Sequence, residues 1–261
     1  MKIAECKNGQ KEVTNNMINT RIKPLLQNAA DIIFPPQCLS CRTSIGIGGS
    51  LCPDCWEDMS FISDPQCEIC GLPFELEAAD GILCGSCIKT PPPYQTARSV
   101  LKYDDKSRNL ITNFKYGDKI HACDNFAKWM ARAGKKTIEN SDVITPVPLH
   151  RIRLFTRRYN QSALLTNSLK KITGIPAYNE LLIRNKHTRP QVGLLPKQRK
   201  ENVKGVFSLN PKYKHFIEGK SVILVDDVMT TGATIEACSK ILKKSGAHKV
   251  NVLTIARTVK S

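Results

Sequence analysis

Four Cys-x-x-Cys pairs lie close together near the N-terminus of this 261-residue chain, and they restrict its fold more than any other feature. The pairs are Cys38 with Cys41, Cys52 with Cys55, Cys67 with Cys70, and Cys84 with Cys87. Each pair forms a turn that directs two sulfurs at one point, and a second pair completes the tetrahedron of thiolates that Zn²⁺ prefers. The eight cysteines therefore predict structural Zn²⁺, one or two ions, in closed sites.

The spacing leaves the pairing of the turns open. Sequential pairing joins the first two turns and the last two, which makes a double zinc ribbon, whereas interleaved pairing is also compatible with the sequence. Disulfides conflict with a reducing compartment, a thioredoxin-like redox site needs one pair rather than four, and an iron–sulfur cluster suits this spacing less well. The segment has few large apolar residues, so metal binding is expected to supply much of its folding free energy.

Charge divides the chain at the same place as the cysteines. Residues 1–97 carry 7 basic and 11 acidic side chains, whereas residues 98–261 carry 32 and 12. The change falls at Pro91-Pro92-Pro93, which is typical of a stiff linker. We expect a leader over 1–34 that is partly helical or disordered, a zinc ribbon over 35–93 and a basic domain over 94–261, with the acidic module docked on the basic one. A strongly basic domain attracts nucleic acid or small phosphorylated molecules, although scattered lysines also serve solubility alone.

Hydropathy indicates where the protein works. No apolar run approaches the roughly 18 residues of a membrane span, and the polar N-terminus lacks the apolar core of a secretory signal. We therefore expect a cytoplasmic protein without a membrane span, in which the thiols stay reduced. Cys123 and Cys238 stand outside the pairs and are expected to pack as small apolar residues.

From Ala97 onward, short apolar runs alternate with helical patterns. Strands are predicted over 98–103, 142–147, 181–184, 221–225 and 250–255, and helices over 105–116, 120–133, 160–173 and 234–244. Such alternation predicts an α/β fold with an open, mainly parallel sheet that is covered by helices on both faces.

One motif in this domain carries chemistry. The strand at 221–225 is followed by Asp226-Asp227 and then by Val228-Met229-Thr230-Thr231-Gly232-Ala233-Thr234, which leads into a helix. Ligands bind beyond the carboxyl ends of such strands, and two adjacent carboxylates there can accept hydrogen bonds from the vicinal hydroxyls of a ribose. The free N–H groups of the helix start, the threonine hydroxyls and Gly232 favour a phosphate. The run predicts a ribose-5-phosphate site; the alternative is an acidic turn with a threonine cap.

This run resembles the phosphoribosyl-pyrophosphate (PRPP) signature of type I phosphoribosyltransferases. Further stretches follow the cysteine pairs in the order seen in the ComF competence-protein family, and the resemblance covers most of the chain from Pro35 to Arg257. These stretches are Phe114-Lys115-Tyr116, Pro146-Val147-Pro148-Leu149-His150, Arg157-Arg158-Tyr159-Asn160-Gln161 and residues 199–207. Arg158 stands where many members carry glycine.

The resemblance implies a type I phosphoribosyltransferase fold with a small N-terminal zinc-ribbon domain. Asp226 and Asp227 would then be the catalytic pair that holds the ribose hydroxyls, and residues 228–234 would bind the 5′-phosphate. The loop formed by Pro146, Val147, Pro148, Leu149, His150 and Arg151 would face pyrophosphate, with Mg²⁺ bridging substrate oxygens. The implied reaction displaces pyrophosphate from the anomeric carbon with a nitrogen nucleophile, and no covalent protein nucleophile is needed.

The same family is associated with DNA uptake in natural transformation. Basic clusters at 150–159, interleaved with Phe155 and Tyr159, and at 184–200 fit single-stranded DNA, and they fit phosphate-handling loops equally well. Two hypotheses follow: an enzyme that uses PRPP and an unidentified nitrogenous acceptor, or a non-catalytic PRPP- or 5′-phosphate-binding module that holds single-stranded DNA. Competence or recombination proteins are expected partners. His150 and His187 are expected to be loop residues rather than metal ligands.

Overall fold

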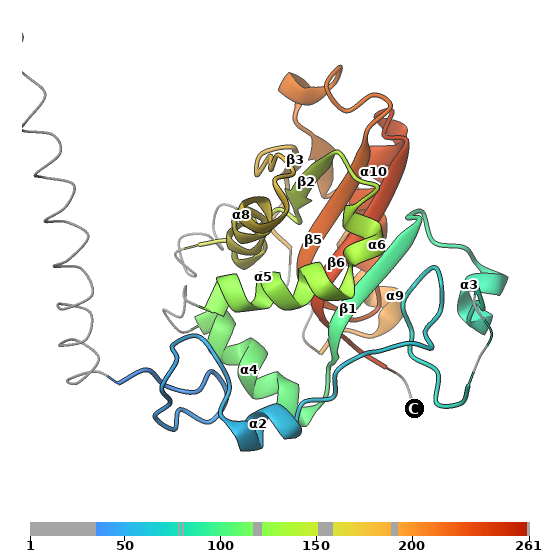
Figure 1. Cartoon of the computed structure of the whole chain (residues 1–261). Coiled ribbons are helices and arrows are strands. Elements are labelled where there is room, and N and C mark those ends of the chain that lie inside the picture. Colours follow the sequence, from blue (N-terminus) through green and yellow to red (C-terminus); the bar gives the residue numbers. More distant parts are fainter. Residues whose placement is uncertain are drawn as a thin grey trace, which may run out of the picture.

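The central element of the fold is a parallel sheet of four strands in the order β1-β6-β5-β2 (Figure 1). These are β1 (Thr96–Lys102), β6 (Lys249–Arg257), β5 (Ser221–Met229) and β2 (Val143–Pro146). The computed structural model describes residues 35–77, 79, 81–116, 122–150, 159–188 and 193–259. The predicted leader, Arg151 and much of the first basic cluster lie outside these residues.

Strand β5 lies between two parallel neighbours and is apolar in its first half, because both of its faces are covered. Its even-numbered residues Val222 and Leu224 belong to the same core cluster as α10 (Ala233–Lys244). Its odd-numbered residues Ile223 and Val225 face the opposite cluster. That face is covered by α4 (Asp105–Tyr116), α5 (Ala122–Ala133) and α8 (Gln161–Thr173), and the short α6 (Lys135–Ile138) follows α5. The predicted α/β class with helices on both faces is confirmed.

A separate two-stranded antiparallel sheet packs beside α10. It consists of β3 (Leu182–Arg184) and β4 (Phe207–Leu209), with α9 (Pro196–Asn202) between them in the sequence and the turn η1 (Pro211–Tyr213) after them. Helix α10 contacts both β4 and α9. Only β3 was predicted from the sequence; β4 is equally short, and α9 is polar throughout.

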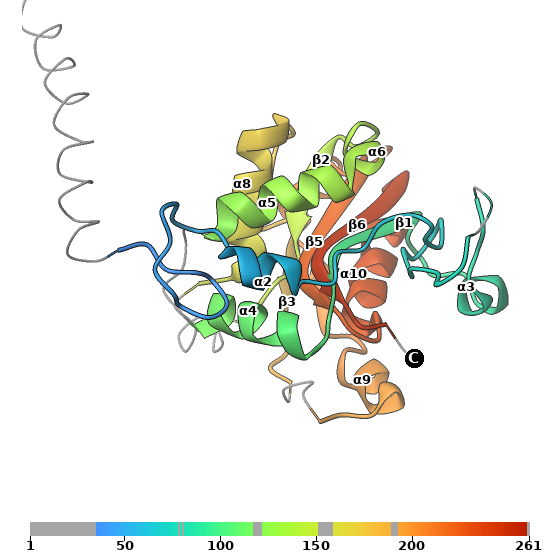
Figure 2. The same cartoon turned by 60° about the horizontal axis from the view of Figure 1, so that its bottom comes forward.

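The cysteine-rich segment contains two short helices, α2 (Pro53–Glu57) and α3 (Gly85–Lys89). The first part of the segment lies beside α4, and the part after α2 runs along the edge of the sheet at β1 (Figure 2). Between the two helices, Phe61 forms an antiparallel bridge with Leu101, and the N–H of Ile62 donates to Val100 O at 2.8 Å. This contact covers the edge of β1, which would otherwise expose unpaired backbone groups.

Ion pairs join the acidic segment to the basic domain. Arg98 Nη2 lies 3.2 Å from Glu68 Oε2, and Lys106 pairs with Asp58. Both pairs combine an acidic residue of the cysteine-rich segment with a basic residue of the other domain. The arrangement is the one expected from the charge division in the sequence.

Most predicted elements lie within a few residues of the observed ones. The main difference is β5, which continues past Val225 through both aspartates to Met229, since its backbone keeps pairing with β6 up to Arg257. Cys123 and Cys238 are 2% and 0% exposed, which confirms them as core residues. No helix in the described ranges is both long and apolar enough to cross a membrane.

Candidate functional site

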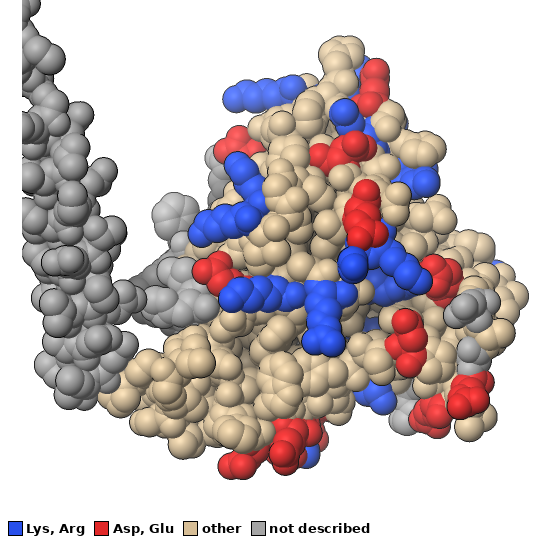
Figure 3. Space-filling model, in the orientation of Figure 1, with Lys and Arg blue, Asp and Glu red and all other residues tan. Residues whose placement is uncertain are grey.

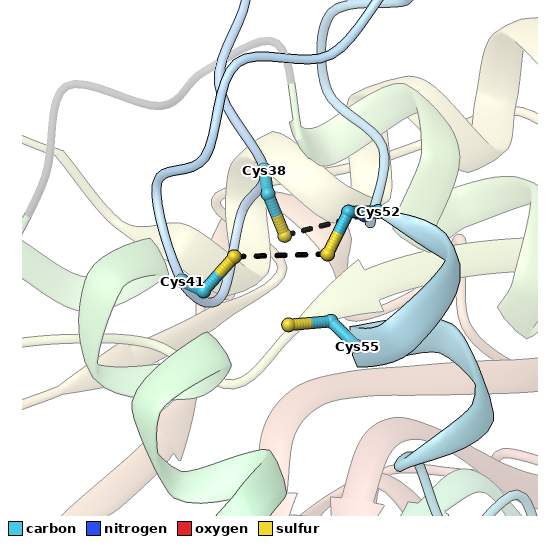
Figure 4. A group of neighbouring side chains, drawn as sticks. All are labelled: Cys38, Cys41, Cys52 and Cys55. Carbon is cyan, nitrogen blue, oxygen red and sulfur yellow. Dashed lines mark hydrogen bonds between the residues drawn. The ribbon is translucent and has the colours of Figure 1, made fainter.

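The eight paired cysteines form two groups of four, and the pairing is sequential. Cys38, Cys41, Cys52 and Cys55 form the first cluster, and Cys67, Cys70, Cys84 and Cys87 form the second. Within each cluster all four sulfurs lie within 4.8 Å of one another. Figure 4 shows the first cluster, in which the four side chains converge on one centre.

Sulfur spacing in both clusters fits a tetrahedral zinc ion. Zn–S bonds of about 2.3 Å place neighbouring sulfurs about 3.8 Å apart. Cys41 Sγ lies 3.7 Å from Cys52 Sγ, and Cys70 Sγ lies 3.6 Å from Cys84 Sγ. Four thiolates leave no open position, so these are structural rather than catalytic zinc-ribbon sites.

The two ribbons repeat the same backbone hydrogen bonds. Cys38 N–H donates to Thr43 O, and Cys67 N–H donates to Leu72 O, both at 2.8 Å. The N–H of Cys52 donates to Cys38 Sγ and the N–H of Cys84 donates to Cys67 Sγ, both at 3.3 Å. The second turn of each ribbon opens a short helix, α2 or α3. The sequence therefore contains a structural duplication.

Hydrogen bonds lower the pKa of at least one thiol in each cluster and so favour its ionisation. Hydrogen bonds from the side chain and backbone of Thr43 lower the pKa of Cys41 to about 6. Burial raises the pKa of Cys67, but backbone N–H groups, first those of Cys70 and Cys84, bring it down to about 7. Thiolate is the form that binds metal, so these thiols are suited to bind zinc at neutral pH. Zinc binding would release protons from the other thiols, such as Cys55, whose pKa burial raises to about 12.

A second site lies at the carboxyl end of β5. Asp226 and Asp227 are both partly buried. They lie in the part of β5 that still pairs with β6, not in the loop beyond the strand. Asp226 Oδ1 accepts from the N–H of Asp227 at 2.9 Å and from the hydroxyl of Ser162 at 3.1 Å. Asp227 Oδ2 lies 3.1 Å from Lys115 Nζ.

Burial and the neighbouring carboxylate both disfavour ionisation of Asp226. Desolvation, and then repulsion from Asp227, raise the pKa of Asp226 to about 7. The N–H of Asp227, the ammonium of Lys115 and the hydroxyl of Ser162 oppose this rise. Strongly shifted carboxyls of this kind are typical of functional sites, where a polar ligand replaces the missing solvation.

Residues far apart in the sequence hold this site together. Lys115 is in the last turn of α4, and its carbonyl accepts from Gln161 Nε2 at 2.9 Å. Asn160 caps α8 by accepting from the N–H of Ser162, and its amide donates to Val147 O at 3.2 Å. The ends of α4 and α8 are thus fixed to each other and to the loop after β2.

The loop predicted to face pyrophosphate lies next to the acid pair. Strand β2 ends at Pro146, which pairs with Val225, and the N–H of Val147 donates to Val225 O at 2.8 Å. Pro148 is buried, while Leu149 and His150 are partly exposed. Arg151 lies outside the described residues. The two predicted loops therefore lie next to each other at the carboxyl ends of β2 and β5.

The predicted phosphate loop forms the turn between β5 and α10. Val228 and Met229 end the strand, Thr230 and Thr231 form the turn, and α10 begins at Ala233 with Thr234 in its first turn. Gly232 is the helix cap and has a φ of 76°, the left-handed conformation that side chains disfavour. The hydroxyl oxygen of Thr231 is buried and has no hydrogen-bond partner among the described residues. An unpartnered donor beside a helix N-terminus fits a phosphate oxygen.

Sequence reasoning missed part of the site. Lys115, Asn160 and Gln161 belong to stretches that resemble the ComF family but carry no local signal of a role, and nothing in the sequence pointed to Ser162. Arg184, expected in a basic cluster, is only 8% exposed and lies over the ring of Phe207, so it is not part of an open surface. The rings of His150 and His187 lie 5.2 Å apart, and no third metal-ligating residue is found with them among the described residues.

Comparisons with known proteins match this two-part organisation. Family models match residues 29–89 as a double zinc ribbon domain and residues 191–260 as a phosphoribosyl transferase domain. Competence protein F of Haemophilus influenzae is 34% identical over 230 residues, which cover 86% of this chain and 98% of that protein.

Two further similarities accompany these matches. The DNA utilization protein YhgH of Escherichia coli K12 is 29% identical over 234 residues, or 87% of this chain and all of that protein. A solved structure of the allosteric regulatory enzyme of purine biosynthesis aligns with 24% identity and a TM-score of 0.37, over 55% of this chain and 30% of that one.

The raised pKa of Asp226 yields a prediction about stability. Because the pKa rises from its usual value near 3.8 to about 7 on folding, the ionised carboxyl destabilises the folded state above pH 7. We expect Asp226→Asn to raise the free energy of unfolding by about 1–3 kcal/mol at pH 8, with the gain shrinking as the pH falls through 7 toward 4. Urea denaturation at several pH values measures this. A gain that does not depend on pH would contradict the electrostatic account.

Proposed function

This chain belongs to the competence protein F family, and we propose that its phosphoribosyltransferase-type domain binds PRPP together with Mg²⁺ at the carboxyl ends of β2 and β5. The proposal rests on three features that lie together at the carboxyl ends of these strands. They are a pair of carboxylates, a helix N-terminus suited to a phosphate, and the loop after Pro146. A ribose, a 5′-phosphate and a pyrophosphate each find suitable chemistry there.

Each part of PRPP would have its own partners. Asp226 and Asp227 would accept hydrogen bonds from the ribose hydroxyls, and the N–H groups at the start of α10 would donate to the 5′-phosphate. The hydroxyl of Thr231 would gain the partner that it lacks. Lys115, now paired with Asp227, lies where its ammonium can neutralise either the acid pair or an incoming anion.

The donor set also suits Mg²⁺. This ion is usually held by one or two carboxylates together with substrate phosphates, rather than by a cage of protein ligands alone. Two carboxylates are present at the site, and the described residues include no group of three acidic or histidine ligands there. Asp226 and Asp227 would hold the ion jointly with substrate oxygens, and the ion would supply charge neutralisation of the leaving group.

We further propose that bound PRPP reacts with a nitrogenous acceptor. A bond forms between the acceptor nitrogen and the anomeric carbon, the bond from that carbon to the pyrophosphate oxygen breaks, and pyrophosphate leaves with the electron pair. Positive charge develops on the sugar, and the nearby carboxylates would stabilise it. A pyrophosphate-release screen over bases, nucleoside precursors and ammonia separates an enzyme from a module that binds PRPP without turnover.

Thr231 gives the sharpest test of binding. Thr231→Val keeps the shape and removes a buried hydroxyl without a partner, so we expect unchanged or slightly higher stability and roughly tenfold weaker PRPP binding, as for one lost hydrogen bond to a charged group. Calorimetry with PRPP and Mg²⁺ measures the affinity. The matched control is Thr166→Val, which removes a buried hydroxyl without a partner from α8 and should leave the affinity unchanged. Equal affinities for both variants would argue against the phosphate site.

A second candidate function, binding of single-stranded DNA, is favoured by the charge on one face of the domain. Figure 3 shows basic side chains gathered over α8, α5 and α6. These helices carry the exposed residues Lys128, Arg132, Lys135, Lys136, Lys170 and Lys171. A row of cations on rigid helices fits the backbone of a nucleic acid, and competence or recombination proteins are then the expected partners.

The salt dependence of DNA affinity tests this surface. Lys128→Gln combined with Arg132→Gln should reduce the slope of log affinity against log salt by about 1–2, because up to two phosphate contacts are lost. Fluorescence anisotropy with a labelled single-stranded oligonucleotide measures the slope. The control pair, Lys240→Gln with Lys244→Gln, removes the same charge from exposed positions of α10 on the other face. A control that changes the slope equally would rule out a specific surface.

A further inference from the structure

The two zinc clusters are embedded in different parts of the core. Buried cysteines of the first ribbon, Cys38 and Cys52, pack with the helices α4, α5 and α8. All four cysteines of the second ribbon belong to the other core cluster, which also contains Met229 and Ala233. These two residues flank the phosphate loop, residues 230–232. The second ribbon and the loop therefore share one packed core, whereas the first ribbon does not.

Arg257 forms the direct connection between them. It is the last residue of β6 and pairs in the sheet with Met229, the last residue of β5 before the loop. The next residue, Thr258, donates its N–H to Met229 O at 2.9 Å. The side chain of Arg257 crosses to the second ribbon, where Nη1 donates to the carbonyl of Cys70, itself a zinc ligand.

The charge of Arg257 has one evident partner. The residue is only 7% exposed, its Nε has no hydrogen-bond partner, and it forms no ion pair with a carboxylate among the described residues. A buried cation requires an opposite charge nearby. Four thiolates around Zn²⁺ carry a formal charge of −2, and Cys70 provides the contact to that cluster. Loss of this zinc would remove a fixed partner from a buried guanidinium beside the loop.

A second residue lies in the same core cluster. Tyr94 is 7% exposed and belongs to the cluster that contains the cysteines of the second ribbon together with Met229 and Ala233. Glu236 lies in the first turn of α10, and a Cβ added at Gly232 would come within 3.6 Å of its carboxylate. The start of α10 and the second ribbon thus share one packed core cluster.

We propose that Arg257 is a positioning residue that couples the second zinc cluster to the phosphate loop. Zinc in the second cluster, and not in the first, keeps residues 230–234 in the conformation that accepts a phosphate. The claim about the loop concerns the free protein, and only its consequence for ligand affinity rests on the proposed function.

Hydrogen exchange of the loop tests the coupling without any ligand. Arg257→Met removes the charge and keeps the length, so we expect about tenfold faster amide exchange in peptides covering residues 228–236, and about tenfold faster release of one zinc per chain to a chromogenic chelator. Arg257→Lys restores the charge and should recover most of the loop protection. Where PRPP binds, its affinity should fall in parallel for Arg257→Met.

Arg98→Met is the matched control. Arg98 also donates to a backbone carbonyl of the second ribbon, that of Glu68 at 3.0 Å. Its strand, β1, pairs with β6 and is separated from β5 by that strand. We expect it to leave the exchange of residues 228–236 unchanged. Unchanged exchange in Arg257→Met, or an equal increase in Arg98→Met, would overturn the proposal.

Stepwise zinc removal from the unmodified protein covers the case in which Arg257→Met does not fold. The first cluster includes the exposed Cys41, whereas all four cysteines of the second are buried, so a chelator should empty the first cluster first. Loop protection should persist after one zinc is lost and fall when the second is lost. Loss of protection with the first ion, or its persistence after both, would contradict the coupling. A protein that shows this coupling but binds no PRPP would count against the proposed function alone.

Discussion

Asp226 and Asp227 lie side by side at the end of β5, a strand that pairs with another strand on each side. The contacts around the site depend on these two adjacent carboxylates being held in place. Neither carboxylate can move away, because β5 stays paired with β6 beyond them. Neighbouring groups compensate them instead: Lys115 of α4 pairs with Asp227, and Ser162 of α8 and the N–H of Asp227 within β5 donate to Asp226. The compensation is incomplete, as the raised pKa of Asp226 indicates. A fold retains such a cost where a ligand uses the charge.

The zinc ribbons solve a different physical problem. A cysteine-rich segment with few large apolar side chains cannot form a core of its own, so it relies on metal and on the neighbouring domain. Gly71 shows how close that contact is, since a Cβ there would lie 2.4 Å from Ala97 O in β1. The duplicated ribbons use the same backbone pattern but pack differently: the first on helices, the second on the sheet edge and the region of the phosphate loop. The two metal sites thus share a backbone pattern but have different neighbours.

Local features of the sequence predicted much of the fold. The spacing of the cysteine pairs indicated both clusters, and the alternation of apolar runs and helical patterns indicated all four strands of the sheet. The helix predicted over 160–173 is observed as α8, and its C-terminal cap is Gly174, which has a left-handed φ of 74°. The strand β5 was predicted too short because its polar residues Asp226 and Asp227 ended the apolar run, whereas pairing with β6 decides where it ends.

The candidate site was predicted only where its residues adjoin one another in the chain. The run from Asp226 to Thr234 was found from its order alone. Lys115 and Ser162 could not be found this way, because their contacts with the acid pair exist only after α4 and α8 pack against the sheet. The division of the two ribbons between separate core clusters is likewise a property of tertiary packing.

The central claim is that one site at the carboxyl ends of β2 and β5 holds a sugar phosphate and a pyrophosphate together. Competition calorimetry in the presence of Mg²⁺ measures this most directly. We expect PRPP to bind with one site per chain, and ribose 5-phosphate and pyrophosphate each to weaken its apparent affinity in a competitive manner. No heat from PRPP at millimolar concentration, or PRPP binding that neither fragment affects, would contradict the account.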